Sequence, residues 1–166
     1  FNKWLDDPLS DFDQILLYSD GSERTGSITC WAVAVFALNT HTCEQRLMGY
    51  FCGHVPTSPT HPLYLGAATA NNQSAELTAF LWMLMYVHSI HQDYPHCTFK
   101  IRSDSLYSIQ MTTEFNAFHA HPIMCTIAQA LYYALIQYAH VDVMHVKAHN
   151  DQPHNELADT LCRAYN

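Results

Sequence analysis

Apolar residues recur along the chain with the two periods that strands and helices require. Short apolar runs over residues 15–18, 29–38 and 45–52 predict three successive strands, with turns at 20–26 and 39–44. Leu77, Leu81, Leu84 and His88 fall at helical spacing and predict a long helix over residues 74–91. The remaining pattern predicts a strand at 97–103, helices at 104–111 and 123–138, a strand at 141–146 and a closing helix at 153–165.

This order of elements indicates a mixed α/β fold. Three strands before any helix predict an antiparallel meander, and the later alternation predicts parallel crossovers, which together give a five-stranded mixed sheet flanked by helices. We assign this domain to residues 14–166 and interpret the polar, acidic residues 1–13 as a lead-in or linker. Residues 53–70 contain three prolines and predict a long loop. Because the chain starts with Phe1, we expect it to be a piece of a longer polypeptide.

The composition and net charge of the chain exclude some classes of function. A hydrophobic content of 49% over 166 residues is enough for one folded domain, and no run is long enough to span a membrane. The net charge of −8, with seven Lys and Arg, argues against strong non-specific binding to nucleic acid. The six cysteines form no CxxC pair, so we expect free thiols in a reducing compartment and an intracellular location, cytoplasmic or nuclear.

Four carboxylates lie in or next to segments that the apolar pattern predicts to be strands or helices. Asp20 and Asp104 each end an apolar run, Glu76 is the lone charge at the head of a long uncharged helix, and Asp159 lies in the tail segment. Each one alone could be a solvated helix cap. Together they suggest a magnesium site, because carboxylates held close to each other repel unless a divalent cation lies between them. Two ions about 4 Å apart would suit hydrolysis of a phosphodiester.

Five short motifs, in this order along the chain, carry a family resemblance. They are Tyr18-Ser-Asp-Gly-Ser, Asn71-Asn-Gln-Ser-Ala-Glu-Leu, Ser103-Asp-Ser, His145-Val-Lys-Ala-His and Asn155-Glu-Leu-Ala-Asp. Over about residues 14–164 the chain resembles the ribonuclease H family. It is most similar to the domains carried by non-LTR retrotransposons, with the free-standing type 1 ribonucleases H as the close alternative.

The resemblance implies an endoribonuclease that hydrolyses the RNA strand of an RNA–DNA hybrid with two Mg²⁺ ions, for which Mn²⁺ can substitute. It implies that Asp20, Glu76, Asp104 and Asp159 are the metal ligands and that His149 assists water activation or product release. It also implies substrate contacts, with Asn155 equally able to cap the last helix. The residues at the substrate-contact positions are Gly21, Ser22, Asn71, Asn72, Gln73 and Asn155.

The chain differs from the family at positions that affect how tightly the substrate is bound. Residues 112–122 carry no Lys or Arg, no Arg precedes the Asn72–Gln73 pair, and Ala148 and Asn150 replace the glycines that usually flank His149. We therefore expect the isolated domain to bind hybrids weakly and to depend on a reverse transcriptase domain in the same polyprotein. Two other readings stay open. One is a catalytically silent module of the same fold, and the other is a different nuclease or strand-transfer enzyme such as a resolvase or integrase core.

Overall fold

A computed structural model describes residues 11–23, 29–114, 120–147 and 153–165, with side chains in the last segment only at 157, 158 and 160–164. The elements follow the order expected from the sequence. They are β1 (Gln14–Glu23), β2 (Thr29–Asn39), β3 (Glu44–His54), α1 (Asn72–Ile90), β4 (Thr98–Ser103), α2 (Leu106–Thr113), α3 (Pro122–Ile136), β5 (His140–His145) and α4 (Pro153–Tyr165).

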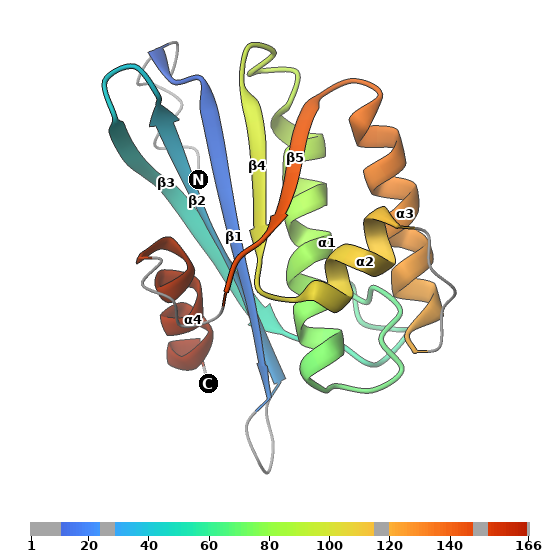
Figure 1. Cartoon of the computed structure of the whole chain (residues 1–166). Helices are drawn as coiled ribbons and strands as arrows, with labels where there is room; N and C mark the ends of the chain where they lie inside the picture. The colour runs from blue at the N-terminus through green and yellow to red at the C-terminus, as the bar shows by residue number, and fades with distance from the viewer. Residues whose placement is uncertain (1–10, 24–28, 115–119, 148–152, 166) are drawn as a thin grey trace.

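The five strands form one mixed sheet in the order β3-β2-β1-β4-β5. β1 pairs antiparallel with β2, and β2 with β3, whereas β4 runs parallel to both β1 and β5. Helices α1, α2 and α3 lie on one side of the sheet, and α4 lies alone on the other, over β1 and β2 (Figure 1). This architecture confirms the predicted fold class.

The central strand β1 is apolar on both faces because helices cover both. Ile15 and Leu17 belong to the main core beneath α1, whereas Leu16 and Tyr18 belong to a second cluster that Leu157 of α4 packs against. Alternating side chains point to opposite faces of a strand, so a strand covered on both sides reads as a continuous apolar run. This double cover fixes the position of β1, the strand that carries Asp20.

Strand β1 continues further than the sequence predicted. We expected a turn over residues 20–26, but Asp20 pairs with Ala32 and Gly21 with Trp31, and the strand ends only at Glu23. The start of β2 provides backbone partners for these residues, and such pairing can outweigh the local turn preference of glycine. Asp20 therefore lies within β1 and not after its end.

The folded domain also extends slightly beyond its predicted start. Phe12 is buried in the main core, and the N–H of Asp13 donates to the carbonyl of Leu38 at 3.1 Å. The carbonyl of Asp13 accepts from the N–H of Thr98 at 3.0 Å. Of the predicted lead-in, Phe12 and Asp13 thus pack with the sheet, and residues 1–10 lie outside the described residues.

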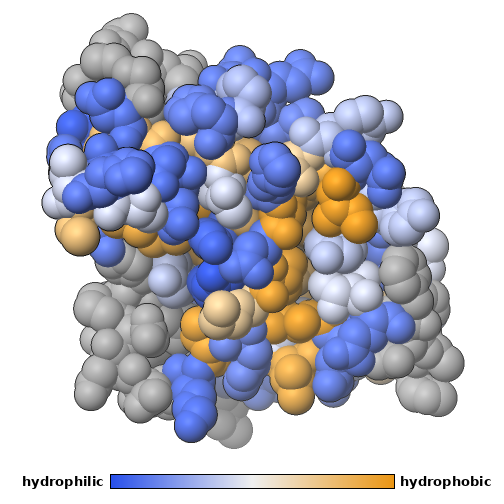
Figure 2. Space-filling view, turned by 45° about the horizontal axis from the view of Figure 1, so that its top comes forward, coloured by the Kyte–Doolittle hydropathy of each residue, from blue (hydrophilic) through white to orange (hydrophobic). Residues whose placement is uncertain are grey.

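The surface mixes polar and apolar side chains. Figure 2 shows hydrophobic groups between hydrophilic ones on the face that it presents. Among the large apolar side chains at the surface, Tyr138 is 80% exposed and Ile123 is 56% exposed. Within the described part of the chain, no helix combines the length and the apolar character needed to cross a membrane.

Candidate active site

Glu76 and Asp104 come together from two separate elements. Glu76 lies in the first turns of α1, and Asp104 directly follows β4. Burial raises the pKa of Glu76 above its ordinary value, and the nearby charge of Asp104 raises it further, against the opposing effect of a hydrogen bond from Ser105. Both side chains are only partly exposed, and Oδ1 of Asp104 is shielded from solvent. Two carboxylates thus share a partly dehydrated site and repel each other.

Asp20 lies at the same end of the sheet. Ser19 and Ser103 are the last matched pair between β1 and β4, and Asp20 and Asp104 are the next residue of each chain segment. Asp20 is 8% exposed; burial raises the pKa of the Cys162 thiol on α4, and the charge of Asp20 raises it further. The carboxylate of Asp20 is therefore buried between β1 and α4, beside the strand end that carries Asp104.

Gly21 allows β1 and α1 to approach each other closely. A Cβ atom at residue 21 would lie 2.4 Å from the backbone nitrogen of Glu76 and 2.9 Å from Cβ of Ala75. Only a residue without a side chain can occupy this position while the backbones remain in place. The contact joins Gly21, the residue after Asp20, to the backbone of Glu76. The neighbouring Ser22 turns the other way, and its hydroxyl lies 3.1 Å from Sγ of Cys162.

The remaining predicted catalytic residues are only partly covered by the structure. Asp159 and Asn155 belong to helix α4, but their side chains lie outside the described residues. Asp159 precedes the buried Cys162 by about one helical turn, and Cys162 contacts Ser22 of β1. His149 lies outside the described residues altogether. The predicted roles of these three residues remain predictions.

The predicted substrate-contact residues on α1 also hold the local structure together. Asn71 is the N-cap of α1, where its side chain accepts from the N–H of Ser74 at 2.9 Å, and its own N–H donates to Oγ of Ser74 at 2.8 Å. Oδ1 of Asn72 accepts from the N–H of Glu23 at 2.8 Å. Gln73 is exposed. Asn72 and Glu76 are one turn apart and so lie on the same side of the helix.

Two residues near the site were not singled out from the sequence. Ser105 lies near enough to Glu76 to oppose the rise of its pKa, and it caps α2 by accepting from the N–H of Ser108 at 3.1 Å. His145, at the end of β5, has Nε2 3.0 Å from the carbonyl oxygen of Asp104. The position of Ser105 directly after Asp104, at the start of a predicted helix, is a capping signal that could have identified it. Nothing local in the sequence indicates the contact of His145, because it depends on strand pairing.

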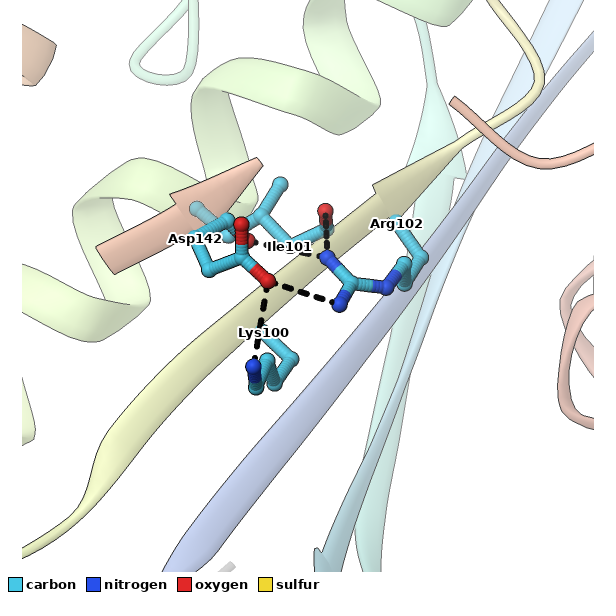
Figure 3. A network of polar contacts seen from close by, with 4 residues as sticks. All are labelled: Lys100, Ile101, Arg102 and Asp142. Atoms are coloured by element: carbon cyan, nitrogen blue, oxygen red, sulfur yellow. Dashed lines mark hydrogen bonds and ion pairs between the residues drawn. The ribbon is translucent and has the colours of Figure 1, made fainter. Parts of the chain in front are cut away.

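An ion-pair network joins β4 to β5 behind the candidate site. One oxygen of Asp142 lies 3.1 Å from Nζ of Lys100 and 3.0 Å from Nη2 of Arg102 (Figure 3). Nη1 of Arg102 also donates to the backbone carbonyls of Ile101 and Asp142, each at 3.0 Å. The network fixes the edge strand β5, whose last residue contacts Asp104. It also commits two of the few basic side chains to structural contacts.

The donor chemistry of the site suits a hard divalent cation. Three buried or half-buried carboxylates, those of Asp20, Glu76 and Asp104, lie at one end of the sheet, and oxygen ligands are those that Mg²⁺ prefers. A cation would remove the repulsion that raises the pKa of Glu76. In the part of the chain that the structure describes, which omits the side chain of Asp159, no three His, Cys, Asp or Glu residues are already grouped tightly enough to hold an ion.

Comparison with protein-family models gives a match that covers almost the whole chain. The model described as RNase H matches residues 13–165. A search of curated proteins finds no significant match.

Solved structures share the fold at low sequence identity. The N-terminal ribonuclease H domain of rv2228c from Mycobacterium tuberculosis aligns with a TM-score of 0.62 and 15% identity, covering 92% of this chain and 93% of that one. LC11 ribonuclease H1, solved in complex with an RNA/DNA hybrid, has a TM-score of 0.59 and 12% identity, with 91% and 98% covered. The foamy viral protease–reverse transcriptase, also solved with an RNA/DNA hybrid, has a TM-score of 0.62 and 14% identity, with 95% of this chain and 20% of that one covered.

Proposed function

The chain belongs to the ribonuclease H family, and we propose that it is an endoribonuclease that hydrolyses the RNA strand of RNA–DNA hybrids. The observation that carries the proposal is the meeting of Glu76 and Asp104 in one partly dehydrated site, with Asp20 on the adjacent strand. A structural module of this fold would have no need of repelling carboxylates at this position. Two similar proteins, LC11 ribonuclease H1 and the foamy viral enzyme, were solved with an RNA/DNA hybrid.

In this proposal, Asp20, Glu76, Asp104 and Asp159 hold two Mg²⁺ ions. When bound, such ions polarise the phosphate, lower the pKa of an attacking water and stabilise the leaving oxygen. The residues of the chain prepare the site for this charge. The close packing of Gly21 on the start of α1 keeps β1 and Glu76 together, and Ser105 beside Asp104 opposes the rise in the pKa of Glu76. His149 would accept or deliver a proton on the product side.

The residues at the start of α1 are suited to contacting the minor groove of the hybrid. Because Oδ1 of Asn72 already accepts from Glu23, the amide NH₂ group remains as the donor that Asn72 can offer to a substrate. Minor-groove base edges present acceptors at every base pair, and the 2′-hydroxyl distinguishes RNA from DNA. Asn72 and the exposed Gln73 would therefore grip the hybrid without sequence preference, one helical turn from Glu76.

We further propose that the domain works within a retrotransposon polyprotein, next to a reverse transcriptase domain. Lys100 and Arg102 are occupied by Asp142, and the net charge of the chain is −8, so little basic surface remains for phosphate contacts. A neighbouring domain with basic residues would supply the missing phosphate contacts. In the foamy viral chain, the region similar to this domain is one fifth of a protease–reverse transcriptase.

The test is a comparison of four end-labelled substrates in Mg²⁺ and in Mn²⁺, at low salt. We expect cleavage of the RNA strand in an RNA–DNA hybrid and none of double-stranded DNA, double-stranded RNA or single-stranded RNA. Cleavage of double-stranded DNA would indicate a different nuclease of the same fold. An intact hybrid under every condition, low salt included, would refute the proposal that this domain is itself an endoribonuclease.

A further inference from the structure

A cavity of about 220 Å³ opens beside the sheet, between the end of β3, the helix α1 and the loop that connects them. Its wall includes Trp31 of β2 and Trp82 of α1, together with residues at the end of β3 and in the proline-containing loop. The loop residues are held by local turns, with the N–H of His61 donating to Ser58 and that of Tyr64 donating to His61, each at 3.0 Å. The proline-containing loop thus forms one side of a shaped cavity.

The aromatic wall is held in place from several sides. The rings of Trp31 and Trp82 are nearly parallel, at 8°, with their centroids 5.2 Å apart. The indole N–H of Trp31 donates to the carbonyl of His54 at 3.2 Å. Gly53 leaves the space for the ring, because a Cβ atom there would lie 3.2 Å from Cζ2 of Trp31. Trp31 is 5% exposed, so the partly exposed Trp82 offers most of the aromatic surface, and a preformed wall loses little freedom when a planar group binds to it.

The polar character of the cavity points to an uncharged ligand. Among the described residues that line it there is no Asp, Glu, Lys or Arg. Nδ1 of His61 lies 3.0 Å from the N–H of Leu63 and accepts from it, so the neutral ring carries its proton on Nε2 and offers a donor. The cavity therefore suits a planar, neutral ring with hydrogen-bond acceptors at its edge. A phosphate group would find no Lys or Arg among these residues.

The cavity lies close to the candidate active site. Trp31 pairs with Gly21 across β1 and β2, and with Gly53 across β2 and β3. Neighbouring strands are about 4.8 Å apart, so the cavity wall begins one strand away from the glycine that packs on Glu76. A nucleic acid bound over the carboxylates would need only a short single-stranded extension to reach the cavity.

We propose that this cavity binds one unpaired nucleobase from a single-stranded extension of the hybrid. A nucleobase has the planar shape, the neutral charge and the edge acceptors that the cavity favours, and proteins commonly bind unpaired bases on aromatic side chains. The inference rests on the proposed function, because the nucleic acid bound at the carboxylates is what brings the base to the cavity. The preferred substrate is then a hybrid with an overhang and not a blunt one.

The experiment compares three labelled hybrids by fluorescence anisotropy in chelator, so that no cleavage takes place. One is blunt, one has a three-nucleotide extension, and one has the same extension without bases. We expect the base-bearing extension to bind at least about fivefold more tightly than the abasic one, which is the range for stacking of one base. Leu63→Glu places a charge at the cavity mouth, where the side chain is 50% exposed, and should remove that difference. Leu47→Glu, at a similarly exposed site on β3 outside the cavity lining, should keep it.

The outcomes separate the cavity from the catalytic proposal. Equal binding of the base-bearing and abasic extensions, or no binding of either, would overturn the inference, even if the blunt hybrid is cleaved in Mg²⁺. Absence of cleavage with a base-dependent difference that Leu63→Glu removes would leave the cavity in place and refute the enzyme. Uridine and N-acetyltyrosine amide serve as competitors. Displacement by the tyrosine derivative alone would assign the cavity to an aromatic side chain of a protein and overturn the inference.

Discussion

The carboxylate of Glu76 lies within electrostatic reach of Asp104, and the pKa of Glu76 is raised above 4.5 by burial first and by the Asp104 charge in addition. The folded chain without metal therefore holds an unfavourable charge at neutral pH. A raised carboxyl pKa means that the folded state binds the proton more tightly than the unfolded state does. Stability then falls as the pH rises from 4.5 through the folded pKa.

Replacing Glu76 with Gln should stabilise the metal-free protein while it removes catalysis. The substitution keeps the shape and removes a partly buried charge, so we expect the free energy of unfolding at pH 7 in chelator to rise by about 1 kcal/mol or less, because solvent screens the partly exposed group. Chemical denaturation of both proteins measures this difference. Asp93→Asn, at an exposed position, is the matched control and should change little. A loss of stability in Glu76→Gln would show that the carboxylate is favourably paired.

Replacing Gly21 with Ala should separate β1 from the start of α1. The new Cβ would meet the backbone at Glu76 and Ala75, which cannot rotate away, so we expect a loss of about 1–3 kcal/mol. For Gly53→Ala the nearest atoms to the new Cβ belong to the side chain of Trp31, at 3.2–3.3 Å, so this substitution should cost less. Thermal unfolding of the two variants measures both effects. Equal losses would contradict the backbone contact at Gly21.

The sequence predicted the order of elements, because apolar periodicity records which faces are buried. It did not predict that β1 continues through Asp20 and Gly21, since that extension depends on pairing with Ala32 and Trp31. The capping role of Asn71 could have been anticipated from its position before a helical pattern, where Asn is a favoured N-cap. The cavity beside Trp31 could not, because its walls come from segments brought together only by folding.

The ion pairs of Asp142 should make stability depend on pH in the acid range. Hydrogen bonds from Arg102 first and Lys100 next lower the pKa of Asp142 below 3.8. A lowered carboxyl pKa adds stability above the unfolded value, and that stability is lost as the pH falls through the folded pKa. Asp142→Asn should therefore be less stable than the wild type at pH 6, by under about 1 kcal/mol because the side chain is 43% exposed, with a smaller difference at the lowest pH.

Urea denaturation at several pH values checks this prediction, again with Asp93→Asn as the control. The stabilities of the wild type and of Asp142→Asn should converge at low pH, as the Asp142 carboxylate of the wild type becomes protonated. A constant difference between them at all pH values would mean that packing, and not charge, carries the contribution of Asp142.

The most direct test of the central claim is cleavage of an end-labelled RNA strand in an RNA–DNA hybrid by the wild type and by Asp104→Asn, at low salt in Mg²⁺. We predict metal-dependent cleavage that falls by about 10²–10³-fold in the variant, as typically follows the loss of one electrostatic group at a reacting centre. Asp93→Asn should cleave like the wild type. Equal cleavage by the wild type and Asp104→Asn, or an intact hybrid with the wild type, would contradict the claim that these carboxylates form the active site of a ribonuclease H.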